Sequence, residues 1–274
     1  MTVCIAAMAR DYIVSVSDTM ISGGTISTDG NTNKQESIAP DWLAMFSGND
    51  ISPALPIIHR VTECLKGRSC NLGVVRSCFK SSFKQQLSEL AADRVLSPFG
   101  LDMATFLKSG KKMFDPATFG SLCSQIQVVR FTELQFLVYG FDDNKTPHIF
   151  KVFGTGEDTL LDNPGFGAIG SGEYAADTIL YYLNHSRKCS LEQGIANACE
   201  AKFVAERADG VGETTTLFVK KHGSVGFAYK TNLVERLRKE WYDSGAPRTT
   251  ERAEEIVKEA EIQCFSDHIS AMSS

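Results

Sequence analysis

TVCIAAMARDYIVSVSD, residues 2–18, is the stretch that decides the fold of this chain. Apolar and β-branched residues fill both halves of the stretch and the polar pair Arg10-Asp11 separates them, which is the pattern of two strands joined by a tight turn. We therefore predict a hairpin of strands 2–8 and 12–17. Chain ends are usually poorly ordered, so an apolar strand directly behind Met1 indicates that this end is held in place.

Outward from this hairpin, strands and helices are predicted in alternating blocks. Strands are predicted over 41–48, 133–141, 148–154 and 165–172, and a final hairpin over 214–229. Helices are predicted over 53–91 and 173–183 and from 233 onward. A further helix is predicted to begin at a capping box formed by Ser190 and Gln193. This order indicates an α+β fold, a four-layer αββα sandwich of two antiparallel sheets flanked by helices. We expect one domain over residues 1–274, with an irregular insertion at 92–116 and a C-terminal helical extension from about 231.

The composition describes an ordinary globular protein. The chain has 274 residues, of which 43% are hydrophobic and 22% charged, enough to bury a sizeable core. The formal net charge is -5 and the basic residues are scattered among acids, so we expect no nucleic-acid partner. The first apolar run is too short to span a membrane and lacks the basic flank of a signal peptide. We therefore expect a cytoplasmic protein with no membrane partner.

The cysteine pattern predicts neither disulfides nor a metal site. Eight cysteines are few for 274 residues, and several stand in apolar contexts where a free thiol acts as a small hydrophobe. The one sequence cluster, Cys64, Cys70 and Cys78, lacks the C-x-x-C pairing and the nearby His that zinc sites use. We expect reduced cysteines and no metal or cofactor.

A glycine motif offers an interpretation of a different class. Gly165, Gly167 and Gly170 fit G-x-G-x-x-G ahead of a predicted helix, which is the fingerprint of a dinucleotide-binding oxidoreductase. In such a site a strand runs into the first glycine, whereas here DNP precedes it, and no acidic residue ends a second strand about twenty residues later. The glycines equally suit tight packing between a short strand and the next helix.

Thr2 is a candidate nucleophile. A Thr hydroxyl is a weak nucleophile that needs a base, and a free α-amine on the same residue serves because its pKa of roughly 7.7 to 8.0 is close to neutral pH. Removal of Met1, which is usual before a small residue, would make Thr2 the first residue. Thr at position two is also common without any function, so Thr2 alone carries little weight.

Three further residues support the prediction that Thr2 is a nucleophile. Asp18 ends the second strand of the predicted hairpin and so returns to the start of the first, where it would pair with a cation such as Lys34. A Lys near the terminal amine would disfavour the protonated form of that amine, which lowers its pKa and keeps it able to take the hydroxyl proton. Gly48, which ends the third predicted strand, offers a backbone N–H for an oxyanion hole. Taken singly, each of these residues has an ordinary structural interpretation.

Asp18, Lys34 and Gly48 lie 16, 32 and 46 residues beyond Thr2, and this register resembles the catalytic register of proteasome β subunits and the bacterial HslV peptidase. TVCIAAMARDYIVSVSDT is similar to their opening hairpin, DWLAMFSGND to the strand and glycine turn before their first helix, and GAIGSGEYAADTIL to their Gly-Ser-Gly turn and next helix. The resemblance covers nearly the whole chain except 92–116 and the tail beyond 244. It implies the fold of N-terminal nucleophile (Ntn) hydrolases.

The resemblance also implies the roles of individual residues. Thr2 would be the nucleophile, with Asp18 and Lys34 tuning it and the Gly48 N–H binding the oxyanion. Ser171 would lie near the terminal amine, and Asp209 resembles the supporting aspartate of the family. Gly212 stands where these peptidases usually carry Ser or Thr, a departure that Thr214 could compensate. By analogy, three side chains would line the pocket for the residue before the scissile bond: Ile21, Thr32 and Phe46.

We therefore predict a threonine-type hydrolase that cleaves peptide bonds through an acyl-Thr2 ester. Its partners would be a peptide or unfolded protein substrate and further copies of the chain in a homo-oligomer. The resemblance suggests a ring-shaped assembly and an ATP-dependent unfoldase partner. The sequence specifies neither the size of a ring nor the identity of such a partner. The alternatives are a small-molecule amidase on the same scaffold and a non-catalytic structural subunit of a proteasome-like assembly.

Overall fold

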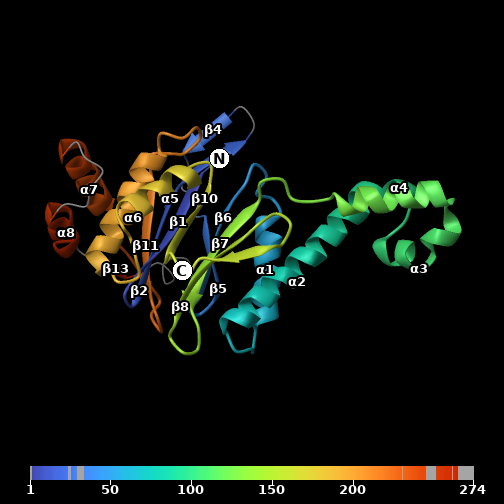
Figure 1. The fold of residues 1–274 in the computed structure, drawn as a ribbon, viewed down its shortest axis with the longest axis horizontal. Coiled ribbons are helices and arrows are strands. Elements are labelled where there is room, and N and C mark those ends of the chain that lie inside the picture. Colours follow the sequence, from blue (N-terminus) through green and yellow to red (C-terminus); the bar gives the residue numbers. More distant parts are fainter. Residues whose placement is uncertain are drawn as a thin grey trace, which may run out of the picture.

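A computed structural model describes residues 2–23, 26–29, 34–229, 231–244, 251–260 and 262–264, with side chains for 2–20, 34–229, 232–244 and 251–260. These residues form two antiparallel sheets with helices on the outer face of each (Figure 1). The predicted α+β class and its two antiparallel sheets are confirmed.

The strands of both sheets come from distant parts of the chain. The first sheet has the spatial order β10 (Phe166–Gly170), β1 (Val3–Ala9), β2 (Tyr12–Asp18), β11 (Thr215–Lys221), β12 (Phe227–Tyr229) and β13 (Ile262–Cys264). The second has the order β5 (Gln35–Ala39), β6 (Trp42–Ser47), β7 (Gln135–Phe141), β8 (Pro147–Val152) and β9 (Asp158–Leu160). A separate short pair joins β3 (Met20–Gly23) and β4 (Ile26–Asp29). The opening hairpin forms as predicted, with Ala9 opposite Tyr12 and Cys4 opposite Ser17.

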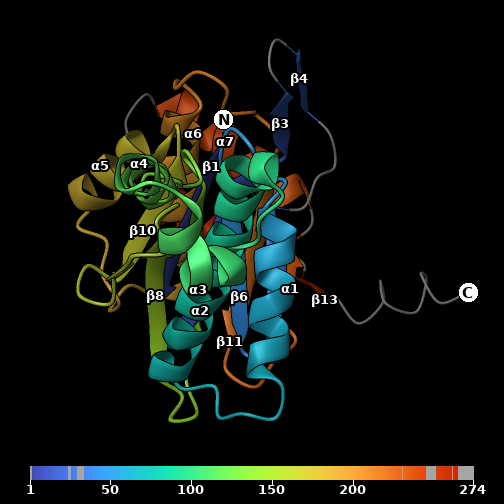
Figure 2. The ribbon, with the colours of Figure 1, turned by 90° about the vertical axis from the view of Figure 1, so that its right-hand side faces the viewer.

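Helices cover the two outer faces. On the first sheet lie α5 (Glu173–Tyr182) and α6 (Leu191–Ala205), with α7 (Thr231–Ser244) and α8 (Glu251–Lys258) outside them. On the second lie α1 (Ala54–Leu65) and α2 (Leu72–Ala91), which cross in front of β6 in Figure 2. The predicted capping box is present, because the Ser190 side chain accepts from Gln193 N while the Gln193 side chain accepts from Ser190 N.

Strand β1 explains the layering, because it is fully buried on both faces. Successive side chains of a strand point to opposite faces. Val3 and Ile5 therefore join the apolar layer under α5 and α6, while Cys4 and Ala6 join the layer between the two sheets. A third apolar layer packs the second sheet against α1 and α2. Three apolar layers separate four layers of secondary structure.

The predicted irregular insertion at 92–116 is mostly helical. Helix α2 runs on through a π-helical turn (Ala92–Leu96) and a 3-10 turn (Ser97–Phe99) into α3 (Met103–Met113) and α4 (Pro116–Gln127), which together project from the body as an arm (Figure 1). The side chains of Asp102 and Asp115 accept from backbone N–H groups as N-caps of α3 and α4. Phe106 stacks on Phe119 within a small separate core. The expectation was wrong because it missed both caps.

The expectation that all cysteines are reduced is also wrong, because Cys64 on α1 and Cys78 on α2 form a disulfide. Their helices pack side by side, with Cα atoms 5.8 Å apart, a separation that bridging permits. Sequence spacing gave no sign of it, because the turn between the two helices sets the distance. No helix in the described ranges is both long and apolar enough to cross a membrane.

We predict that the disulfide stabilises the pair α1 and α2 measurably. It closes a loop over a sequence separation of 14, and loops of that size contribute about 3 kcal/mol by constraining the unfolded chain. Dithiothreitol should lower the free energy of unfolding in urea by about that amount, while a Cys64→Ser/Cys78→Ser variant should not respond. Alkylation of both Cys64 and Cys78 in denatured, unreduced protein would contradict the prediction.

Candidate functional site

Thr2 lies buried directly before β1, an interior strand of the first sheet, with 3% of its surface exposed. Its carbonyl oxygen accepts hydrogen bonds from Gly172 N at 3.3 Å and from Ser171 Oγ at 3.3 Å. Gly170 has φ +93°, and a Cβ there would lie 2.2 Å from that oxygen. Only glycine lets the turn between β10 and α5 approach Thr2 so closely. This is the role that the structure gives to the GAIGSG segment.

Asp18 and Lys34 both reach the Thr2 hydroxyl. Asp18 is fully buried and Lys34 is 4% exposed, and their ion pair measures 2.9 Å from Nζ to Oδ1. Thr2 Oγ1 donates to Asp18 Oδ1 and accepts from Lys34 Nζ. Asp18 Oδ1 also accepts from Val3 N at 2.9 Å. The three residues that the sequence placed 16 and 32 positions apart meet in one buried cluster.

The second oxygen of Asp18 fixes the surrounding backbone. Asp18 Oδ2 accepts from Met20 N at 3.2 Å and from Gly212 N at 3.2 Å. The Gly212 carbonyl in turn accepts from Lys202 Nζ at 2.7 Å. Because Gly212 takes part through its backbone, its departure from the usual Ser or Thr does not remove the loop from the site.

Sequence reasoning missed the charged group behind Gly212. Lys202 is fully buried and pairs with Glu206, the residue that follows α6, and Glu206 pairs with Arg238 on α7 at 2.9 Å. Burial lowers the pKa of Lys202, against the opposing effect of Glu206. The only signal in the sequence is a Lys and a Glu four residues apart on a helix, which is usually an exposed pair.

A pocket of about 460 Å³ opens beside Thr2. Three segments line it together with Thr2: the end of β6 with Ser47, Gly48 and Asn49, the start of β7 with Glu133 and Gln135, and the turn into α5 with Gly170, Ser171 and Glu173. Gly48 therefore faces the same space as Thr2, as the oxyanion assignment requires. Among the described residues, the side chains that line the pocket include two carboxylates and no cation.

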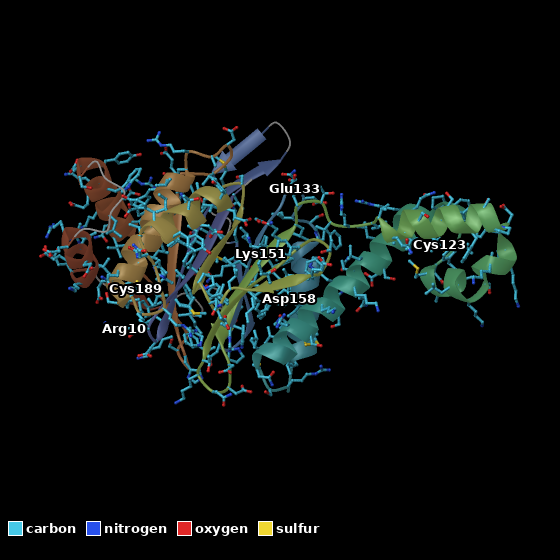
Figure 3. The ribbon with its side chains drawn as sticks, in the orientation of Figure 1. Arg10, Cys123, Glu133, Lys151, Asp158 and Cys189 are labelled. Atoms are coloured by element: carbon cyan, nitrogen blue, oxygen red, sulfur yellow. A yellow bond between two sulfur atoms is a disulfide. The ribbon has the colours of Figure 1, made fainter. Side chains whose placement is uncertain are left out.

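The acidic side of the pocket continues into the protein. Glu173 pairs with Lys151, which lies in the body of the molecule (Figure 3). One turn along α5, burial raises the pKa of Asp177 to about 6, and its Oδ1 has no hydrogen-bond partner among the described residues. Glu133, at the rim of the pocket, is exposed and stands in the left-handed region with φ 61°.

One predicted site residue, Asp209, does not contact the cluster around Thr2. Asp209 is exposed and makes no hydrogen bond or ion pair to Thr2, Asp18 or Lys34 within the described chain. Its turn is held through the backbone of Gly212 instead.

The predicted substrate pocket is only partly described. Phe46 points to the helix side of β6, packs 6.3 Å from the Phe136 ring, and does not line the pocket. It occupies that face because side chains alternate along the strand. The Ile21 side chain and the whole of Thr32 lie outside the described residues.

Cys4, two residues from Thr2, is not a competing nucleophile. Its thiol is fully buried, and burial raises its pKa to about 12, whereas the reactive form of cysteine is the thiolate. No cluster of His, Cys, Asp and Glu with metal-binding geometry occurs in the parts of the chain that the structure describes. No protein-family model and no curated protein matches the chain.

The buried pair gives a stability prediction. Asp18→Ala leaves the Lys34 ammonium and three backbone N–H groups without their acceptor, and removing one partner of a buried pair costs about 3–5 kcal/mol. Lys34→Met should cost less, since the Asp18 carboxylate keeps its backbone donors. Urea denaturation measures both, with the exposed Asp209→Ala as the matched control, expected within about 0.5 kcal/mol of the parent. An Asp18→Ala variant as stable as the Asp209→Ala control would contradict a stabilising role for the buried Asp18–Lys34 pair.

Proposed function

We propose that this protein is a threonine-type N-terminal nucleophile hydrolase, of the kind represented by proteasome β subunits and HslV, which cleaves amide bonds in peptides. The observation that carries the proposal is the hydroxyl of Thr2, which is hydrogen-bonded to both Asp18 and Lys34 and lies beside a pocket. A hydroxyl between a buried carboxylate and a buried ammonium group is unusual for a residue with a structural role alone.

The reaction begins after removal of Met1. The free α-amine of Thr2 takes the proton from Oγ1, which attacks the carbonyl carbon of the scissile amide. The Lys34 ammonium stabilises the developing charge on Oγ1, and the Gly48 N–H donates to the oxyanion. The protonated amine then passes its proton to the leaving amine as the C–N bond breaks, which leaves an ester on Thr2. Water, activated by the same amine, hydrolyses that ester.

Two features support the remaining parts of the proposal. Ser171 donates to the Thr2 carbonyl, a contact that supports a role for its hydroxyl in orienting Thr2. Helix α5 exposes Tyr174, Tyr181 and Tyr182 at 84%, 64% and 54%, and exposed tyrosines are enriched at protein interfaces. We therefore propose that the active form is a homo-oligomer that uses this helix.

The proposal requires a free amine on Thr2. Two proteins are compared on fluorogenic peptide amides: one that begins at Thr2, and one with a single Gly before Thr2, which converts the amine into a non-basic amide. We expect the Gly-extended protein and Thr2→Ala to lose at least about a thousandfold in kcat/KM, as when a nucleophile or its base is removed. Equal activity of the two N-termini in folded protein would contradict the mechanism.

The carboxylate of Glu133 predicts the charge of the preferred substrate, because Glu173 is paired with Lys151 while Glu133 forms no ion pair among the described residues. Amide substrates with Lys or Arg next to the scissile bond should be cleaved about threefold to tenfold faster than norleucine or Glu analogues, since opposite charges attract. Glu133→Gln should remove the preference, whereas Glu235→Gln on α7 should keep it. Equal kcat/KM values for Lys and Glu substrates would contradict the prediction.

A further inference from the structure

Three hairpin turns converge at the end of the sheets that lies opposite the Thr2 pocket. Strands β1 and β2 run from Thr2 and Asp18 to the turn at Arg10, and Figure 3 shows Arg10 and Glu133 at opposite ends of the body. The turns β1–β2, β7–β8 and β11–β12 together surround a hollow of about 260 Å³. The side chains that line it are Arg10, Asp11, Phe141, Lys145, Pro147, Lys221 and His222.

The lining of this hollow is basic in a protein that is acidic overall. Arg10, Lys145 and Lys221 against Asp11 give a local charge of +2 (3 - 1) with His222 neutral, whereas the whole chain carries -5. Each cation comes from a different hairpin, with Arg10 and Lys145 in turns and Lys221 at the end of β11, so the cluster is not a run of basic residues in the sequence. Like charges brought together in this way repel one another unless an anion joins them.

Among the described residues, Arg10, Lys145 and Lys221 form no ion pair. Lys221 lies over the Tyr12 ring at 5.3 Å instead, an interaction that keeps its charge.

Three neighbouring carboxylates are engaged by other groups. Asp41 pairs with the buried Lys220 at 2.9 Å through Oδ1, and its Oδ2 lies 3.7 Å from Nε2 of His222 at the hollow. Asp142 accepts from two N–H groups of its own turn, at 2.9 and 2.8 Å, and Asp143 accepts from Ser69 and from Cys70 N. Asp11 is therefore the one carboxylate that lines the hollow among the described residues, and it leaves two of the three positive charges without an opposing charge.

Two of the cations also stand at costly backbone positions. Arg10 has φ 49° and Lys145 has φ 66°, in the left-handed region where Gly or Asn fits with less strain. Only two other non-glycine residues of the described chain have positive φ. Tight turns that carry long basic side chains in place of glycine are consistent with a use for those side chains.

We propose that this hollow binds the phosphate group of a small soluble molecule. The Arg10 guanidinium offers paired donors that match phosphate oxygens, and Lys145 and Lys221 add point charges from the two facing turns. Phe141 and Pro147 provide an apolar wall against which the organic part of a phosphate monoester packs. The proposal is independent of the reaction at Thr2, which lies at the other end of the same strands.

The test uses inorganic phosphate and phenyl phosphate as probes, titrated into the full chain and followed by NMR amide shifts at constant ionic strength. Both probes should perturb the turns at Arg10, Lys145 and Lys221 and saturate below about 1 mM, with phenyl phosphate the tighter because it also contacts the apolar wall. Arg10→Gln/Lys145→Gln/Lys221→Gln should weaken binding at least about tenfold.

The matched control is Lys108→Gln/Lys111→Gln/Lys112→Gln on α3, which removes the same three charges from exposed positions on the arm. It should leave binding unchanged. An equal loss in both triple variants would show non-specific attraction and overturn the proposal, as would saturation above tens of millimolar in the parent. Binding to phosphatidic-acid vesicles without binding of inorganic phosphate would also contradict it. Single variants answer the question if the triple variant of the turns does not fold.

Discussion

The rest of the structure depends on one buried carboxylate, that of Asp18. It accepts hydrogen bonds from the backbone at Val3, Met20 and Gly212 and pairs with Lys34, so it ties together the start of β1, the end of β2, the loop before β11 and the approach to β5. A charge buried this deeply is tolerated only with such a set of partners. The same carboxylate that fixes these four segments also holds the hydroxyl of Thr2.

The two ends of the sheets carry side chains of opposite charge. At one end, the turn from β10 into α5 and the start of β7 bring Glu133 and Glu173 beside Thr2. At the other end, the hairpin turns of the same strands bring Arg10, Lys145 and Lys221 together. The buried β1, which feeds two apolar layers, is the rigid element between them, and rigid elements position sites better than loops do.

Local patterns in the sequence predicted the opening hairpin, the helix pairs, the final hairpin and the meeting of Thr2, Asp18 and Lys34. These patterns did not predict features that depend on how separate elements pack against one another. The Cys64–Cys78 bridge depends on how α1 and α2 pack, the arm depends on caps at Asp102 and Asp115, and the Lys202–Glu206–Arg238 group spans two helices. The sequence does not show the exposure of Asp209 or the face taken by Phe46, because side-chain direction follows from register.

The most direct test of the central claim is to find which atom of the protein is the nucleophile. Protein that begins at Thr2 is treated with a peptide β-lactone, which a nucleophilic oxygen opens without a leaving group, and is examined by intact-mass and peptide-mapping mass spectrometry. The account predicts a single adduct with the full mass of the inhibitor, located on Thr2. An adduct on another residue, or unmodified protein that still hydrolyses peptides, would contradict it.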